Sequence, residues 1–263
     1  MIKQTLKYNR QLAAEVPGLR TVMVTEPDAL GAAKELHART YRRVGIQPPE
    51  AITVEGCIGL AFDPYQTHAQ YFSVQDVRDG EGEPRTVAAV RVILADPDSG
   101  LDSFPMFHEK RPLYPRYRAL LEALDPATCG EISALVREPG TNGKASLMLY
   151  RAVWHYALSE RHAYLLVLCK ARLYRRCKVI FGNSWIRVGP GYDRLANIRE
   201  IPVVIDISGS LDEALTLSRV NPVKRRIKLK ALQFFLRGLP EDVISPAHRA
   251  KLDRYRLQTA ASR

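Results

Sequence analysis

The stretch EISALVREPGTNGKASLMLYRAVWHYALSER, residues 131–161, decides the predicted fold of this chain. Residues 132–136 are apolar and lie between a glycine and a proline, which predicts a short buried strand. Residues 147–158 repeat apolar side chains at spacings of three and four, which predicts an amphipathic helix. The sequence therefore predicts a strand, a glycine-containing loop and a helix in direct succession.

The loop between that strand and helix has the composition of an anion-binding turn. It begins at Arg137, contains Gly140 and Gly143, and ends at Lys144. The first N–H groups of a helix have no partner inside the helix, and the helix dipole favours negative charge there. An anion is one interpretation, and an ordinary strand-to-helix turn is the other.

A nucleotide-binding phosphate loop is excluded for the same segment. That motif requires a glycine where Glu138 stands, and a Ser or Thr directly after the lysine, where Ala145 stands.

Composition indicates a globular protein with a strong basic excess. The chain has 263 residues, 46% hydrophobic and 25% charged, with a formal net charge of +11. No apolar run approaches the roughly 18 residues of a membrane span, and the polar N-terminus lacks a secretion signal. We expect a cytoplasmic protein whose positive charge serves an acidic protein, a phosphorylated ligand, a membrane surface or a nucleic acid.

The cysteines and histidines predict neither disulfides nor a metal site. The four cysteines, which include no CxxC pair, are Cys57, Cys129, Cys169 and Cys177. We expect free buried thiols, with Cys129 as a nucleophile the less favoured alternative. The six histidines lack metal-ligand spacing, so we expect no metal.

The remaining elements alternate between the two secondary structures. Strands are predicted at 21–25, 69–75, 86–94, 162–169, 179–181 and 202–207, and helices from Pro27 to about Arg42, at 117–124 and directly before residue 179. This order predicts a mixed α/β sheet protein with helices on its faces. We expect one domain over residues 1–215 and a basic, partly amphipathic helical extension over 216–263.

Arg91 lies within the apolar predicted strand 86–94. A charge in such a position is rarely left without a partner, so Arg91 either pairs with a carboxylate or binds a ligand.

Several short motifs together resemble one family. They are Arg39-x-x-Arg42, Asp63 with Thr67-x-x-x-Tyr71-Phe72, Val87-Ala-Ala-Val-Arg91 and Glu131-Ile-Ser133-Ala-Leu-Val. Over residues 20–210 the chain resembles the GNAT acyltransferase superfamily, in the branch that holds acyl-homoserine-lactone synthases and bacterial N-acyl amino acid synthases. Lactone synthases usually carry Arg after the signature Ser, where this chain has Ala134, which favours the amino acid synthases.

The resemblance implies a fold and an activity. The fold is a mixed, mostly antiparallel central sheet with helices on both faces, in which strands 131–136 and 164–169 splay apart to admit a pantetheine arm. The activity is transfer of a long-chain acyl group from acyl carrier protein or acyl-CoA to the amine of an amino acid or similar small molecule. The thioester is a substrate, and no permanently bound cofactor is implied.

The resemblance also assigns roles to residues. It makes Glu131 the general base, Ser133 an orienting group and Tyr174 the acid that protonates the leaving thiolate. The residues it assigns to the acceptor are Arg91, as the partner of a carboxylate, with Arg42, Asp63, Tyr71 and Phe72. The residues it assigns to the arm are Val136, Arg137, Gly140, Gly143 and Lys144.

Two basic segments suggest partners. Arg172, Arg175, Arg176 and Lys178 form a group that suits an acidic acyl carrier protein, or else a solvated helix face. Residues 222–238 carry six cations and no acid among apolar residues at helical spacing. That segment suits an anionic membrane surface or an acidic partner, or else docks on its own domain.

Three alternative functions remain open on the sequence. They are a short-chain acetyltransferase that uses acetyl coenzyme A, an acyl-homoserine-lactone synthase, and a basic protein that binds nucleic acid or membranes without catalysis. Nucleic acid is the least favoured partner, because the cations are not interleaved with aromatic residues in a recognisable reading motif.

Overall fold

The computed structural model describes most of the chain as two compact units. It describes residues 16–78, 84–108, 112–195, 198–215, 231, 233–239, 243–251 and 253. The first unit comprises Met1–Arg111 with Asp125–Trp154, and the second comprises Pro112–Leu124 with His155–Arg263.

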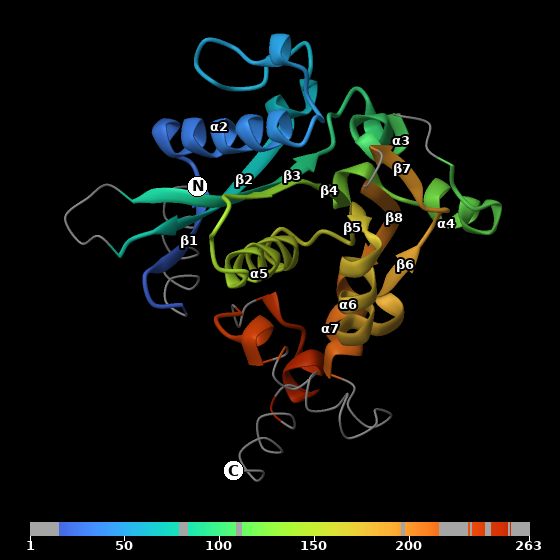
Figure 1. Cartoon of the computed structure of the whole chain (residues 1–263). Helices are drawn as coiled ribbons and strands as arrows, with labels where there is room; N and C mark the ends of the chain where they lie inside the picture. The colour runs from blue at the N-terminus through green and yellow to red at the C-terminus, as the bar shows by residue number, and fades with distance from the viewer. Residues whose placement is uncertain are drawn as a thin grey trace. The chain divides into compact units, whose positions relative to one another are not determined.

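The first unit contains an antiparallel sheet with a helix on each face. Its strands are β1 (Leu19–Val24), β2 (Ala69–Asp76), β3 (Arg85–Leu94) and β4 (Cys129–Arg137), and each pairs with the next in sequence order. Its helices are α2 (Pro27–Arg43), the short α3 (Pro105–His108) and the first part of α5 (Lys144–Ser159). Figure 1 shows α2 and α5 on opposite sides of these strands.

Two-sided coverage explains why β3 is apolar along almost its whole length. Strand residues point alternately to the two faces, and both faces of this strand are covered. Under α2, Ala89 packs with Tyr71 and Val136 in a cluster that includes Ala33 and Leu36 of the helix. Strand β4 and helix α5 confirm the strand, loop and helix predicted for residues 131–161, and both elements are slightly longer than predicted.

The second unit contains a second antiparallel group of strands. They are β5 (Tyr164–Lys170), β6 (Trp185–Arg187), β7 (Tyr192–Leu195) and β8 (Ile198–Asp206), and β8 pairs with each of the other three. Its helices are α4 (Arg118–Glu122), α6 (Ala171–Phe181) and α7 (Ile207–Leu215). Across both units, the described residues include 3-10 turns at Pro49–Ala51, Pro64–His68, Gly100–Ser103, Pro115–Tyr117, Pro126–Thr128 and Gly182–Ser184.

The mixed α/β, antiparallel fold class is confirmed, whereas one strand assignment is wrong. Residues 179–181 continue helix α6, and the strand lies at Trp185–Arg187. An apolar run of three residues fits either structure, and here Cys177 and Phe181 are buried at the four-residue spacing of a helix face. The predicted separation of strands 131–136 and 164–169 concerns strands of different units and stays a prediction.

The described part of the C-terminal segment packs within the second unit. Phe235, Leu236 and Ile244 are buried there. The Phe235 ring meets that of Phe181 edge-on at a centroid distance of 5.3 Å, and its carbonyl oxygen lies 2.7 Å from Nε2 of His155. Of the alternatives considered for this segment, its described residues therefore dock on the protein itself, within the second unit.

Other predictions for the C-terminal segment stay open. The cations at 224–230 lie outside the described residues. The domain boundary after residue 215 stays a prediction. No helix in the described part of the chain is long and apolar enough to cross a membrane.

The docked segment yields a stability prediction. We expect Phe235→Ala to lower the free energy of unfolding by about 3 kcal/mol, because a buried aromatic ring leaves a cavity when truncated. The half-buried neighbour Phe234 is the matched control, and Phe234→Ala should cost clearly less. Urea unfolding monitored by circular dichroism measures both, and equal losses would contradict the docking.

Candidate active site

A buried ion pair lies at the centre of the first unit. Nη1 and Nη2 of Arg91 donate to Oδ2 and Oδ1 of Asp63 at 2.7 and 3.0 Å. Nη1 also donates to the Tyr71 hydroxyl at 3.4 Å. The Arg91 and Asp63 side chains are only 4% and 6% exposed. Of the two outcomes expected for Arg91, pairing with a carboxylate is therefore the one observed.

Strand register and a compact loop bring these groups together. Tyr71 on β2 and Ser133 on β4 are the direct neighbours of Arg91, so the three side chains share a sheet face. Asp63 comes from the loop before β2, where its N–H donates to the Gly59 carbonyl oxygen at 3.1 Å. The loop thereby holds the carboxylate over the sheet.

Burial and the contacts between these groups shift the pKa values of Arg91 and Tyr71. Burial acts to lower the pKa of Arg91, but the hydrogen bonds and negative charge of Asp63 outweigh it and raise that pKa. Burial raises the pKa of Tyr71, against the opposing charge of Arg91. Arg91 spends both terminal nitrogens on Asp63, and its buried Nε has no hydrogen-bond partner among the described residues.

Glu131 lies on the same sheet face, one pair of residues along β4. Glu131 is the register partner of Ile93, which lies two residues from Arg91 along β3. Glu131 is only 1% exposed. Its Oε2 accepts the backbone N–H of Met106, the second residue of α3, at 2.9 Å. No sequence pattern indicated Met106, because a backbone donor leaves no trace in residue type.

A β-bulge follows Ser133 directly. Ala89 pairs with Val136 and Arg91 with Ser133, so two residues of β4 oppose one of β3. Ala134 takes a φ of +50°, which costs a residue with a Cβ about 1 kcal/mol. Bulges bend a strand and redirect its side chains, so Glu131 and Ser133 precede a change in strand direction.

Two other predicted acceptor residues, Phe72 and Arg42, are not brought to this cluster, and Tyr174, the predicted acid for the leaving thiolate, belongs to the second unit. Phe72 is adjacent to Tyr71 in β2 and therefore points to the opposite sheet face. Arg42 is exposed near the C-terminus of α2. Tyr174 lies in α6 of the second unit, where burial raises its pKa and the charge of Arg187 opposes that rise.

Some hydrogen-bond donors of the loop predicted to hold an anion are already bonded to acceptors within the loop. Arg137 donates to the carbonyl oxygen of Thr141, and Oδ1 of Asn142 accepts the N–H of Lys144 at 3.0 Å. Gly140 takes a φ of +77°, which suits glycine, and Gly143 has open space where a Cβ would be. Phosphate binding at this loop stays a prediction.

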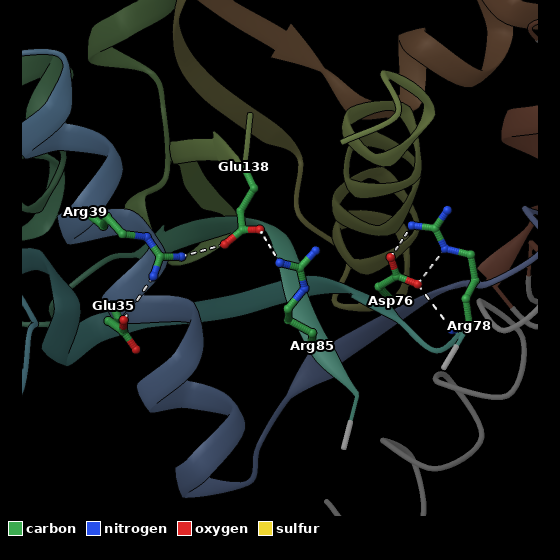
Figure 2. A network of polar contacts seen from close by, with 6 residues as sticks. All are labelled: Glu35, Arg39, Asp76, Arg78, Arg85 and Glu138. Atoms are coloured by element: carbon green, nitrogen blue, oxygen red, sulfur yellow. Dashed lines mark hydrogen bonds and ion pairs between the residues drawn. The ribbon is translucent and has the colours of Figure 1, made fainter. Parts of the chain in front are cut away.

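Glu138 fixes the start of this loop to the rest of the unit. Its carboxylate bonds Arg39 of α2 at 2.7 Å and Arg85 of β3 at 3.1 Å, as Figure 2 shows. Arg39 also bonds Glu35 at 3.1 Å. The residue that replaces the motif glycine is thus a link between a helix, a strand and the loop.

The cysteines are free, and three of the four are buried as expected. Burial raises the pKa of Cys129 to about 11, and those of Cys169 and Cys177 to about 12. Thiols with such pKa values hold little thiolate at neutral pH, so none of these three has the character of a nucleophile. No group of metal-ligating side chains occurs among the described residues.

Together the strand order, the bulge and the flanking helices define a GNAT-like fold, the class that the sequence resemblance implied. Among solved structures, FeeM, an N-acyl amino acid synthase from uncultured soil microbes, is 14% identical at a TM-score of 0.51, covering 74% of this chain and 94% of that one. The AHL synthase LasI is 16% identical at a TM-score of 0.50, covering 72% and 90%. MesI, a CoA-dependent acyl-homoserine lactone synthase, is 16% identical at 0.50, covering 81% and 95%.

Similarity at this level of identity establishes the fold. No protein-family model matches the sequence, and no curated protein matches it.

The ion pair yields a second stability prediction. We expect Asp63→Asn to lower the free energy of unfolding by about 3 kcal/mol or more, because it leaves the Arg91 guanidinium buried without a counter-charge. Replacing both partners, as Asp63→Leu with Arg91→Met, should recover much of that loss. Glu35→Gln, which removes a half-exposed ion pair, serves as the control and should cost less than about 1 kcal/mol. Urea unfolding of the four proteins measures the coupling, and a double variant no better than Asp63→Asn would contradict it.

Proposed function

We propose that the protein is an N-acyltransferase that moves an acyl group from a pantetheine thioester to the amine of an amino acid or similar small molecule. One observation carries the proposal: the buried Glu131 carboxylate shares a sheet face with Ser133 and the Arg91–Asp63 pair. The similarity in fold to an N-acyl amino acid synthase and to lactone synthases supports the same class of reaction.

The chemistry requires a base because an aliphatic amine is protonated in neutral solution and must lose a proton before it can attack the thioester. Two carboxylic acids and one guanidinium occupy this face, an excess of acid that favours a cationic ammonium group. Glu131 takes a proton from that ammonium, directly or through water. Ser133 orients the amine toward the thioester.

The transfer itself exchanges one acyl bond for another. The amine nitrogen bonds to the thioester carbonyl carbon, and the carbon–sulfur bond then breaks. The amine nitrogen gives up its second proton and the departing thiolate takes one up, so the amide and a free thiol leave as products. The sequence resemblance assigns the proton of the thiol to the Tyr174 hydroxyl. Preorganised groups around the carbonyl oxygen supply the largest share of such rate enhancements.

Acyl carrier protein is the donor that the surface of α6 favours. Arg172, Arg175 and Arg176 are exposed at spacings of three and four, and Val179, 45% exposed, continues the same face. An acidic carrier would meet three cations and one apolar contact there. Lys178 belongs elsewhere, because its Nζ donates to the Trp185 carbonyl oxygen at 3.1 Å.

Acyl-CoA is the second candidate donor. MesI, with a similar fold, is described as CoA-dependent. A purified-enzyme assay with matched acyl groups on the two carriers distinguishes them: neutralising Arg172 and Arg175 should raise the KM for the carrier protein and leave that for acyl-CoA nearly unchanged.

A membrane surface is a less favoured partner for the described residues of the tail. Insertion would need the apolar area of Phe235, which is 5% exposed and packed against Phe181. A peripheral cytoplasmic location through the cations at 224–230 remains a separate proposal, which vesicle flotation with the full chain tests.

The activity has a direct test. Mass spectrometry of lipid extracts from cells that overproduce the protein should reveal a new acylated amine, and the purified enzyme should make the same compound. Glu131→Gln keeps the side-chain shape and should reduce turnover about a hundredfold or more.

The exposed Glu122→Gln is the matched control and should retain full turnover. Thermal melting of each variant separates lost chemistry from lost folding. Wild-type turnover in a folded Glu131→Gln protein would remove Glu131 from the mechanism, and absence of any acylated product would overturn the proposed activity.

A further inference from the structure

Three side chains of the second unit form a hydrogen-bonded row. Oγ of Ser245 lies 2.9 Å from Nδ1 of His248, and Nε2 of that histidine lies 3.1 Å from Oδ1 of Asp212. Ser245 and His248 come from the C-terminal segment, and Asp212 comes from α7. A hydroxyl, an imidazole and a carboxylate therefore meet in the order of a nucleophile, a base and a group that orients the base.

The hydrogen-bond roles in this row follow from what each group can donate or accept. An ionised carboxylate only accepts, so Nε2 of His248 carries the proton that faces Asp212. In the neutral ring Nδ1 is then the acceptor, and the Ser245 hydroxyl donates its hydrogen to it. The tautomer that Asp212 selects thus makes His248 a base directed at Ser245.

The neighbours of Asp212 favour its ionised form. Nζ of Lys251 donates to the same Oδ1 atom, and this hydrogen bond is the largest of the causes that lower the pKa of Asp212. His248 acts on that pKa in the same direction. A carboxylate in this state stabilises the imidazolium that forms when His248 takes up a proton.

Helix capping alone does not account for the row. Ser245 precedes the helical residues 246–251, and its Oγ accepts the backbone N–H of His248 at 3.2 Å, as in an N-cap. A cap needs neither the ring of His248 nor the carboxylate of Asp212, which belongs to another helix. Ser245 is exposed, whereas the side chain of His248 is only 14% exposed. The hydroxyl is therefore open to a reagent while its base is largely shielded from water.

We propose that Ser245, His248 and Asp212 form a second reactive site, which takes an acyl group from a carboxylic ester and hydrolyses it. Oγ of Ser245 bonds to the ester carbonyl carbon while its proton passes to Nδ1 of His248. The bond from that carbon to the leaving oxygen breaks, and His248 gives the proton to this oxygen, so an alcohol departs. Water then cleaves the acyl-serine by the same proton path and releases the carboxylic acid.

This activity is separate from the proposed acyl transfer to an amine. All three residues belong to the second unit, and none of them has a role in that transfer. The reagents that test the site contain neither an amine nor a pantetheine thioester. A negative result here therefore leaves the amine acylation unaffected, and a protein that acylates no amine can still give a positive result here.

Covalent labelling of the full-length protein with diisopropyl fluorophosphate tests the site directly. The reagent phosphorylates activated hydroxyl groups, and peptide mass spectrometry locates the label. We expect Ser245 to be labelled about a hundredfold faster than Ser208, an exposed serine of α7, because a positioned base accelerates reactions by this order. The wild-type protein should also hydrolyse p-nitrophenyl acetate, and Ser245→Ala should not.

Variants separate reactivity from a structural role. His248→Gln removes the base and should slow labelling of Ser245 about a hundredfold. Asp212→Asn should slow it about tenfold or more, and Asp212→Glu should restore part of the rate, because this carboxylate positions the ring. Lys251→Gln is the matched control: it removes the other partner of Asp212 and should change the rate less than about threefold, since a partly exposed ion pair contributes little.

Three results would overturn the proposal. The first is labelling of Ser245 no faster than that of Ser208 in the wild-type protein, a comparison that needs no variant. The second is a wild-type labelling rate in a His248→Gln protein whose melting temperature is unchanged. The third is an equal loss in His248→Gln and Lys251→Gln, which would show that the row only holds the C-terminal segment against α7.

Discussion

The first unit depends on the ion pair of Arg91 and Asp63, two charges that lie almost entirely out of water. Removing either charge from solvent is expensive, and their mutual attraction offsets the cost only while the geometry of both hydrogen bonds is kept. The loop before β2 must therefore hold Asp63 over the sheet, and Tyr71 and Ser133 must flank Arg91 on the neighbouring strands. A structural requirement of this kind also limits function, because an arginine that neutralises an internal carboxylate has few donors left for a substrate.

Charge compensation thus separates the arginines of this protein into two groups. Those that meet a carboxylate inside the chain, such as Arg91 and Arg39, contribute to architecture. For others, such as Arg116 and Arg187, the contacts found within the described residues are with rings or carbonyl oxygens rather than carboxylates. Residue type alone makes no such distinction, and the net charge of +11 is therefore a poor guide to where an anion binds.

The sequence was informative where a feature has a local period and uninformative where it depends on distant contacts. Alternation and helical spacing located β3, β4 and α5, and a charge within an apolar strand correctly marked Arg91 as a residue with a partner. The same reasoning could not select Asp63 as that partner over a ligand, nor find the Met106 N–H that meets Glu131, because both contacts are set by the tertiary fold. The Tyr-Pro-Arg-Tyr run at 114–117 can be seen in the sequence. Its contact with Arg187 could not be predicted, because the tertiary fold sets that contact.

The order of the chain has a consequence for how the protein emerges from the ribosome. The segment Pro112–Leu124 interrupts the first unit in sequence but belongs to the second, where Tyr114 pairs with the backbone of Val188. During synthesis the first unit is therefore complete only after β4 and the start of α5 have been made. The tyrosine- and arginine-rich segment 112–124 is synthesised before them. That segment gains its partner only after β6 has been made, so nascent chains pass through a stage in which aromatic surface is open to chaperones.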